Sequence, residues 1–425
     1  MRTSFLGRVA LRDGLLTADD WRGDGPLYSM SLAGSPPGTR RYFWDSLAIL
    51  IRGVINLRES TAPIDPERIA TEIRIHYLET GTIPTDRLEG AFSIVLLDAA
   101  TQRVRIYRNF AGTGPVYYRT TANGLAVGSN LADLALSELP QGQAASLPGE
   151  TLFSGCRRVL PGEEILWDAG KLTWRPVEVL ASPTPAGDFD SVLDRVMRDI
   201  GATFERPSTV LLGDPASQTM QEAYNRTIRT DLIPATYSPS FEVAGWSETD
   251  RAMTASRSLG TAHQLISVDD FHGDLRRWIE RTGEIPSADE VALFRVAQTM
   301  QRRGHGVALA ADTLDAAQPS GLWRRGLEAL TTLMWTNREP VGPPIEQLSP
   351  TAPALWNSLG IDLVYPFLDS RMLSLVGRRF PRPARPPYSV AAEEAALLWW
   401  RAFSNRTVAP LQAPSKFEPT RSDAA

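Results

Sequence analysis

The hydrophobic pattern changes its period near residue 180, and this change restricts the fold more than any other feature of the sequence. Before it, short apolar runs alternate with turn residues. The runs "FSIVLLD" (92–98) and "RVRIYRN" (103–109) flank a four-residue loop, as in a hairpin. Further hairpins are expected at two turn pairs, Asn123-Gly124 and Ala169-Gly170. With one helix expected over 66–81, this pattern predicts an antiparallel, sandwich-like domain over residues 1–180.

After a Pro- and Gly-rich stretch at 181–188, expected to be a linker, helical segments alternate with short buried strands. Strands are expected at 208–212, 233–241, 263–268 and 305–312, and helices at 220–228, 248–259 and 291–302. Such alternation predicts a mostly parallel sheet with helices on both faces, over residues 189–425. Ligands bind such sheets beyond the carboxyl ends of the strands, so the loop after residue 212 is a candidate site.

The composition excludes several classes of protein. The 425 residues suffice for two or three domains, and 43% apolar and 22% charged residues are ordinary for a soluble protein. A net charge of −5 disfavours a nucleic-acid binder, and the single cysteine, Cys156, excludes an internal disulfide. The sequence has no run of 18 apolar residues and no secretory signal, so a cytoplasmic protein that does not contact membranes is expected.

Three segments resemble the class B asparagine synthetase family and occur in that family's order. "LEGAFSIVLLDAATQRVRIYRNFAGTGPVYYR" (88–119) is similar to its glutaminase domain, and "ATYSPSFEVAGWSETDRAMTASRSLGTAHQLISV" (235–268) to its synthetase domain. "LVYPFLDSRMLSLVGRRFP" (363–381) is similar to a segment near its C-terminus. The resemblance implies an α/β chain: an Ntn-hydrolase-like αββα sandwich, then an adenine-nucleotide α-hydrolase-like domain. Members such as β-lactam synthetase and lasso-peptide cyclases adenylate a carboxylate and then close an amide.

The resemblance also implies where glutamine hydrolysis would occur, and the residues there do not suit it. The family's nucleophile is a cysteine directly after the initiator Met, where this chain has Arg2. Arg52 begins the segment that matches the family's Asn-Gly-Glu, and Asn109 stands for its aspartate. A guanidinium is no nucleophile, and Cys156 is expected to be a packed core thiol. The chain is therefore expected to lack glutaminase activity.

The family's ATP loop, Ser-Gly-Gly-x-Asp-Ser, aligns with the segment that begins at Gly213. A pyrophosphate needs backbone N–H groups and hydroxyls turned toward it. Pro215 has no N–H, and Asp214 places a carboxylate where phosphate charge would lie. The loop is therefore interpreted as degenerate. The alternative is an ordinary strand-to-helix turn capped by Ser217 or Thr219.

The resemblance implies two further functional positions, a metal site and a catalytic lysine. Asp315 matches an aspartate that meets Mg²⁺ and pyrophosphate, and Asp312 could join it, although both could equally be solvated or capping residues. Lys416, one of two lysines among 44 basic residues, matches a lysine that stabilises charge during amide formation, unless it is a surface residue of the tail. His263 is expected to be a hydrogen-bonded structural histidine.

The preferred hypothesis is a degenerate asparagine-synthetase-like protein without cofactor. It would act as a substrate-binding or scaffolding subunit in natural-product or modified-peptide biosynthesis, with an intact amide ligase or a precursor peptide as its partner. The alternative is an ATP- and Mg²⁺-dependent amide-forming ligase in which Lys416, Asp315 and Asp312 work. A third hypothesis, ATP-independent chemistry, finds no nucleophile–base pair in the sequence. Relatives often pair, so an oligomer fits the family, but nothing in the sequence specifies an interface.

Overall fold

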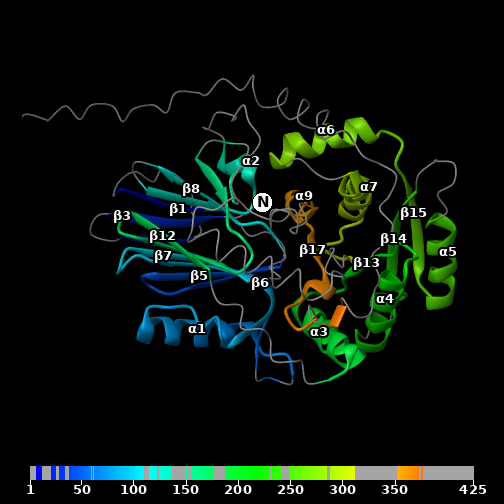
Figure 1. The fold of residues 1–425 in the computed structure, drawn as a ribbon, viewed down its shortest axis with the longest axis horizontal. Helices are drawn as coiled ribbons and strands as arrows, with labels where there is room; N and C mark the ends of the chain where they lie inside the picture. The colour runs from blue at the N-terminus through cyan, green and yellow to red at the C-terminus, as the bar shows by residue number, and fades with distance from the viewer. Residues whose placement is uncertain are drawn as a thin grey trace, which may run out of the picture.

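The computed structural model of the chain joins an antiparallel, two-sheet part to a part built on a parallel sheet (Figure 1). It describes residues 6–11, 21–24, 28–33, 38–58, 60, 62–109, 114–121, 124–135, 149–151, 153, 155–176, 187–228, 232–240, 248–284, 288–311, 352–372 and 375–376. The linker expected at 181–188 lies mostly outside these residues, so the domain boundaries stay a prediction.

Two antiparallel sheets form the N-terminal part. The first has the order β10-β8-β9-β1-β3-β2 and the second β12-β11-β7-β6-β5-β4 among the described residues. The strands of the first are β1 (Leu6–Leu11), β2 (Trp21–Asp24), β3 (Tyr28–Ala33), β8 (Tyr117–Thr121), β9 (Gly124–Gly128) and β10 (Cys156–Arg158). Those of the second are β4 (Thr39–Phe43), β5 (Leu47–Leu57), β6 (Leu88–Asp98), β7 (Arg103–Arg108), β11 (Glu163–Asp168) and β12 (Lys171–Pro176). The predicted antiparallel sandwich is confirmed.

The predicted hairpins are present, with one correction of register. Asp168 pairs with Lys171, which leaves Ala169 and Gly170 as a two-residue loop with φ of 45° and 99°, as a type I′ turn requires. In the preceding hairpin, Thr121 pairs with the glycine that begins β9, so the loop lies one residue earlier than Asn123-Gly124. Pairing along both strands, and not the turn dipeptide alone, sets this register.

One helix covers the outer face of the second sheet. Helix α1 (Pro66–Thr80) begins at Asp65, whose side chain accepts the Glu67 N–H, and ends at Gly81 in the left-handed conformation, as predicted. Its buried face packs on β5 and β6 in one apolar core. A second core fills the space between the sheets. The outer face of the first sheet packs against the short α2 (Leu131–Leu134) and against α6 (Phe271–Thr282) of the C-terminal part.

The C-terminal part contains the predicted parallel sheet, in the order β15-β14-β13-β16-β17. Its strands are β13 (Ser208–Val210), β14 (Ala235–Ser240), β15 (Ala262–Ser267), β16 (Val307–Leu309) and β17 (Asp362–Val364), and all neighbours pair parallel. When the five strands are counted in chain order, they follow the strand order of a doubly wound fold. In such a fold the strand order reverses at one point, here between β13 and β16. The carboxyl ends of these two strands are where such folds place ligands.

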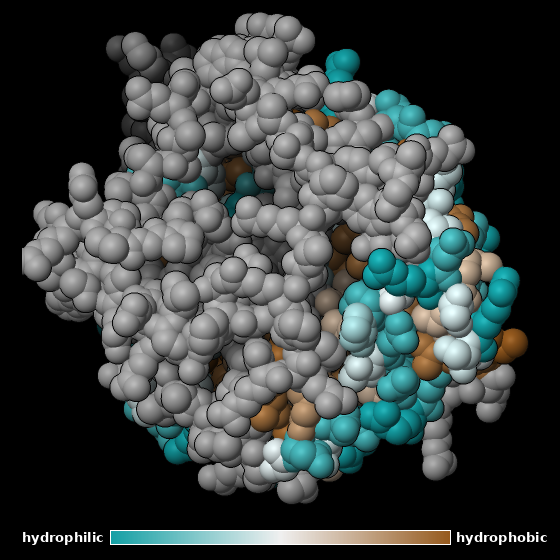
Figure 2. Space-filling model, turned by 45° about the vertical axis from the view of Figure 1, so that its right-hand side comes forward, coloured by the Kyte–Doolittle hydropathy of each residue, from teal (hydrophilic) through white to brown (hydrophobic). Residues whose placement is uncertain are grey.

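Helices cover both faces of this sheet (Figure 1). Helices α3 (Phe189–Thr203) and α4 (Pro215–Thr227) pack on one face, and α6, α7 (Ala288–Arg302) and α9 (Ala352–Ser358) on the other. Helix α5 (Glu248–Leu259) has its predicted bounds and lies along β14 and β15. Figure 2 shows the described surface over α4 and α5 as mostly hydrophilic. None of the described helices has both the length and the apolar character that a bilayer span requires.

Helix α4 begins earlier than the sequence suggested. We expected the helix over 220–228, but it starts at Pro215, because Asp214 acts as its N-cap and proline fits the first helical position. The sequence analysis interpreted residues 213–217 as a phosphate loop and therefore did not place the start of a helix there.

Candidate functional site

The loop between β13 and α4 is the candidate nucleotide site, and its own side chain fills it. The Asp214 carboxylate accepts the N–H groups of Ala216 at 2.8 Å and Ser217 at 3.0 Å. The Ser217 hydroxyl donates to the Asp214 carbonyl oxygen and accepts the N–H of Leu212. The cap is therefore Asp214, and not Ser217 or Thr219 as the alternative interpretation had it. The N–H groups of Leu212, Ala216 and Ser217 are therefore already bonded within the loop.

Gly213 lies directly against helix α5 and does not face open space. Its φ is 77°, and a Cβ there would lie 2.5 Å from the backbone nitrogen of Ala252 in α5. The Gln218 side-chain amide donates to the Gly213 carbonyl oxygen at 2.8 Å. In this loop the glycine permits the close approach of α5, which is a structural reason for its presence.

The other candidate residues for ATP chemistry lie outside the described residues: Asp312, Asp315 and Lys416. Residues 310–311, which follow β16, are described, and β16 pairs with β13. The described end of β16 therefore lies at the same edge of the sheet as the Asp214 loop. Within the described residues, no group of three His, Cys, Asp or Glu could hold a metal ion.

His263 lies on β15 and makes two contacts with hydroxyl groups of β14. Its Nδ1 lies 2.8 Å from the Thr236 hydroxyl and its Nε2 lies 3.2 Å from the Ser238 hydroxyl. Burial lowers the pKa of His263. With both ring nitrogens engaged, this histidine joins two strands and has no nitrogen left for a substrate.

Of the three glutaminase positions, the structure describes Asn109 and Arg52, and both side chains contact other residues of the chain. The Asn109 amide donates to the Gly90 carbonyl at 2.7 Å and its oxygen accepts the Phe92 N–H. Arg52 is fully buried and contacts Asp362 of β17 at 3.4 Å. Arg2 lies outside the described residues.

Cys156 is the only thiol of the chain, and the structure places it inside a core. Its residue is 2% exposed in β10, and it belongs to the apolar core that the first sheet shares with α2, α6 and α7. A buried thiol in apolar surroundings is not available as a nucleophile.

A buried charged cluster at the junction of the two parts was missed by the sequence analysis. Arg371 bonds the Asp369 carboxylate twice at 2.9 Å, and also contacts Asp199 at 2.5 Å and Glu89 at 3.4 Å. The pKa of Glu89 rises to about 7 because burial disfavours its charged form, while Arg371 opposes the rise. A signal was available, since Glu89 and Asp369 stand within two of the motif segments quoted for the resemblance.

The same two motif segments also bond through their backbones. The Gly90 N–H donates to the Ser370 hydroxyl at 3.1 Å, and the Ser370 N–H donates to the Gly90 carbonyl at 3.3 Å. These two segments therefore help to hold the two parts of the chain together.

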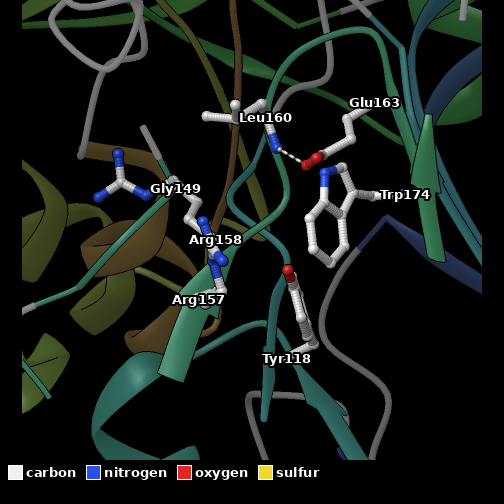
Figure 3. Close-up of a pocket in the computed structure, with 7 residues that line it drawn as sticks. All are labelled: Tyr118, Gly149, Arg157, Arg158, Leu160, Glu163 and Trp174. Atoms are coloured by element: carbon white, nitrogen blue, oxygen red, sulfur yellow. Dashed lines mark hydrogen bonds between the residues drawn. The ribbon is translucent and has the colours of Figure 1, made fainter. Parts of the chain in front are cut away.

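A small surface pocket opens where the edges of the two sheets meet (Figure 3). Figure 3 shows the Glu163 carboxylate beside the Leu160 N–H, which it accepts at 2.8 Å, with Trp174 and Tyr118 alongside. Burial raises the pKa of Glu163 to about 7. Its empty space of about 210 Å³ includes open solvent, so the room enclosed by the protein is smaller still and does not suit a nucleotide.

Comparison with known proteins adds one family match. Residues 61–135 match the family model described as a glutamine amidotransferase domain. The N-terminal part is glutamine-amidotransferase-like. The matched segment contains α1, β6, β7, β8 and β9, so this amidotransferase-like part includes Glu89 on β6 and Asn109, which directly follows β7.

Among curated proteins, none matches the chain. Three similar solved structures are the allosteric regulatory enzyme of purine biosynthesis (13% identity, 62% of this chain, 74% of that chain, TM-score 0.25), a glutamine aminotransferase class-II domain protein from Silicibacter pomeroyi (14%, 41%, 98%, 0.22) and glutamine phosphoribosylpyrophosphate amidotransferase from B. subtilis complexed with ADP and GMP (11%, 63%, 75%, 0.21). These TM-scores are too low to bear on the arrangement of this chain.

Proposed function

We propose that this amidotransferase-like chain performs neither the glutaminase nor the ATP-consuming step of class B asparagine synthetases and serves as a substrate-binding or scaffolding subunit. One observation carries the proposal: the Asp214 carboxylate occupies the N–H groups of Ala216 and Ser217. A phosphate entering the loop would have to displace a covalently attached anion.

The cost of that displacement can be compared with the affinity of an ordinary nucleotide site. Each charge-assisted hydrogen bond that ATP fails to form costs roughly 1.5–3 kcal/mol. Two such losses weaken binding by about two to four orders of magnitude, since each ~1.4 kcal/mol is tenfold. Pro215 removes a third donor. At cellular ATP concentrations such a loop stays without nucleotide.

The scaffolding role rests on what has been kept. The backbone and side-chain bonds between the Gly90 and Ser370 segments hold the two parts in a fixed relation while the catalytic positions differ. The partner we propose is an intact amide ligase, or the precursor peptide on which such a ligase acts, in natural-product or modified-peptide biosynthesis. Co-purification from the native host tests this, and a preparation that yields neither contradicts the partner assignment.

A titration with ATP and Mg²⁺ tests the loss of nucleotide binding. We expect no rise in melting temperature for the native chain at roughly 1 mM ATP–Mg²⁺, a concentration that saturates most enzymes. The matched variant Asp214→Ser/Pro215→Gly removes the internal anion and restores an N–H, and it should gain a rise. A rise in the native chain that this double substitution changes would place nucleotide at this loop and would falsify the proposal.

The alternative, an ATP-dependent amide-forming ligase, has one observation in its favour. The strand order reverses between β13 and β16, which is where doubly wound sheets bind nucleotides. Under this alternative, Lys416, Asp312 and Asp315 act with ATP and Mg²⁺, and the acid substrate yields AMP and pyrophosphate. Turnover that survives Lys416→Ala unchanged would count against it.

A further inference from the structure

Four buried polar atoms gather where the sandwich meets the parallel sheet, and none has a hydrogen-bond partner among the residues that the structure describes. They are Thr39 Oγ1, Arg52 Nε, Arg52 Nη1 and Asp362 Oδ2. The side chains of Arg52 and Asp362 are 0% exposed. Buried polar groups in native proteins are nearly always paired, and each exception calls for a cause such as a missing ion or ligand. Four exceptions on three neighbouring residues indicate one shared site.

The register of the second sheet explains why these groups meet. Thr39 of β4 pairs with Arg52 of β5, and Arg52 pairs with Ser93 of β6, so their side chains emerge on one face. This face is the inner one, because Ala48 and Leu50 at alternate positions of β5 belong to the core between the sheets. The side chains of Thr39, Arg52 and Ser93 lie where that apolar core ends.

Asp362 and two glycines complete the site. Asp362 is the first residue of β17, and its Oδ1 accepts one long bond of 3.4 Å from Arg52 Nη2. A Cβ on Gly38 would lie 1.8 Å from Asp362 Oδ2, and one on Gly114 would lie 2.7 Å from Arg52 Nη1. Glycine at these positions lets the backbone pack directly against the two charged groups, where any side chain would displace them.

The unused atoms define the chemistry of a ligand. Arg52 offers two donors, Thr39 offers a hydroxyl, and Asp362 offers an acceptor. Two arginines, Arg40 and Arg52, act electrostatically on the single Asp362 carboxylate, which leaves an excess of positive charge. Burial raises the pKa of Asp362 to about 6, so at neutral pH this carboxylate is largely ionised and can accept a hydrogen bond. The ligand must be an anion that also donates.

We propose that Thr39, Arg52 and Asp362 form a binding site for a small oxyanion that carries a proton, of the hydrogen phosphate class. Hydrogen phosphate accepts from Arg52 and Thr39 and donates its O–H to Asp362, whereas sulfate can only accept. This goes beyond the proposed function, because Asp362 lies at the amino end of its strand and the Asp214 loop at the carboxyl end of β13.

The first test compares inorganic phosphate with sulfate by calorimetric titration of the full chain at equal ionic strength. We expect phosphate to bind at least about tenfold more tightly than sulfate, because one additional hydrogen bond to a charged group changes the affinity by about that factor. Asp362→Asn should remove this preference. Equal affinities for the two anions in the native chain, or no phosphate binding, would overturn the proposal.

The second test puts a carboxylate into the site. Ser93→Asp places an anion beside Arg52 on the same strand face, so it should raise the melting temperature without ligand and abolish phosphate binding. Ser93→Asn has the same shape without charge and should retain binding. Because phosphate and sulfate stabilise most proteins by exclusion, the difference between these variants is the measurement. A Ser93→Asp protein that melts below Ser93→Asn and still binds phosphate contradicts the site.

This pair of variants also separates the site from the nucleotide question. ATP could bring its own phosphates to Arg52, so the ATP titration is repeated in Ser93→Asp. A melting-temperature rise with ATP that disappears in Ser93→Asp supports the oxyanion site and leaves the Asp214 interpretation standing. A rise that persists there contradicts the proposed function alone. Binding of L-glutamate without any binding of phosphate would overturn the ligand class.

Discussion

Single residues explain what the two motif segments around Glu89 and Asp369 do in the fold. Gly90 has a φ of 118°, and a Cβ there would lie 2.3 Å from the Val54 carbonyl oxygen, so no other residue fits without moving β5. Its neighbour Glu89 belongs to the Arg371 cluster. Both residues are needed for the junction of the two parts, whether or not any chemistry takes place.

Glu89 makes stability depend on pH. Its pKa is about 7 in the folded chain and ordinarily 4.5, so folding favours its neutral form. The stabilisation is therefore complete below about pH 4.5 and is lost as pH rises through about 7. Glu89→Gln, which stays neutral beside Arg371, Asp199 and Asp369, should reduce the fall in unfolding free energy between about pH 5 and 8 by on the order of 2 kcal/mol.

Urea denaturation across that pH range measures the effect. Asp362 and Glu163, whose pKa values are also raised by burial, remain in the variant, so part of the slope persists. A variant with an unchanged slope would show that Glu89 does not titrate in this window.

The position of Cys156 gives a simple chemical prediction. At 2% exposure its thiol should not react with Ellman's reagent in the folded protein and should react fully in denaturant. Reaction of the native protein at the rate of a small thiol would contradict the packing.

At the scale of elements, the β13–α4 connection is a strand, a turn and a helix, and the turn is an ordinary helix start. It contains a capping aspartate followed by proline at the first helical position. Helix α5 packs over Gly213. The N-terminal dipole of α4 is thus compensated by Asp214 and not by a ligand.

The cap can be tested separately from nucleotide binding. Asp214→Ala removes the acceptor for two N–H groups and should cost about 1 kcal/mol of unfolding free energy, whereas Asp214→Asn keeps an acceptor and should cost less. Urea denaturation of both variants gives the comparison. Equal stability of the alanine variant and the native chain would mean that α4 does not need this cap.

At the scale of the whole molecule, buried polar contacts join the two parts. Arg371 meets three carboxylates, Tyr117 of β8 donates to Glu284 at 2.5 Å, and Arg158 meets the same Glu284 at 2.7 Å. Apolar residues of the first sheet also share a core with α6 and α7. The two parts are therefore expected to unfold as one unit.

Loss of the central arginine should be severe. Arg371→Met leaves Asp369, Asp199 and Glu89 buried without their cation, which should cost about 3–5 kcal/mol. Arg22→Met, which breaks an exposed ion pair with Asp24, is the matched control and should cost less than about 1 kcal/mol. Similar losses in the two variants, measured by urea denaturation, would show that the cluster does not stabilise the junction.

The sequence by itself determined the features that depend only on residues close together along the chain. The change of period separated the antiparallel from the parallel part, Gly81 ended α1, and Pro215 removed an N–H from the candidate phosphate loop. Each of these follows from backbone geometry within a few residues. The start of α4 was predicted wrongly although it is local, because an aspartate cap was read as a lost phosphate contact.

Only the tertiary structure decided which distant side chains meet. Arg52 and Asp362 lie 310 residues apart, and Arg371 and Glu89 lie 282 apart. Contacts of this kind depend on strand register and on how the two parts pack, which no local period specifies. The sequence could therefore indicate which residues differ from the motifs of the family it resembles, but the unpaired atoms around Arg52 became visible only when strands from both parts were placed side by side.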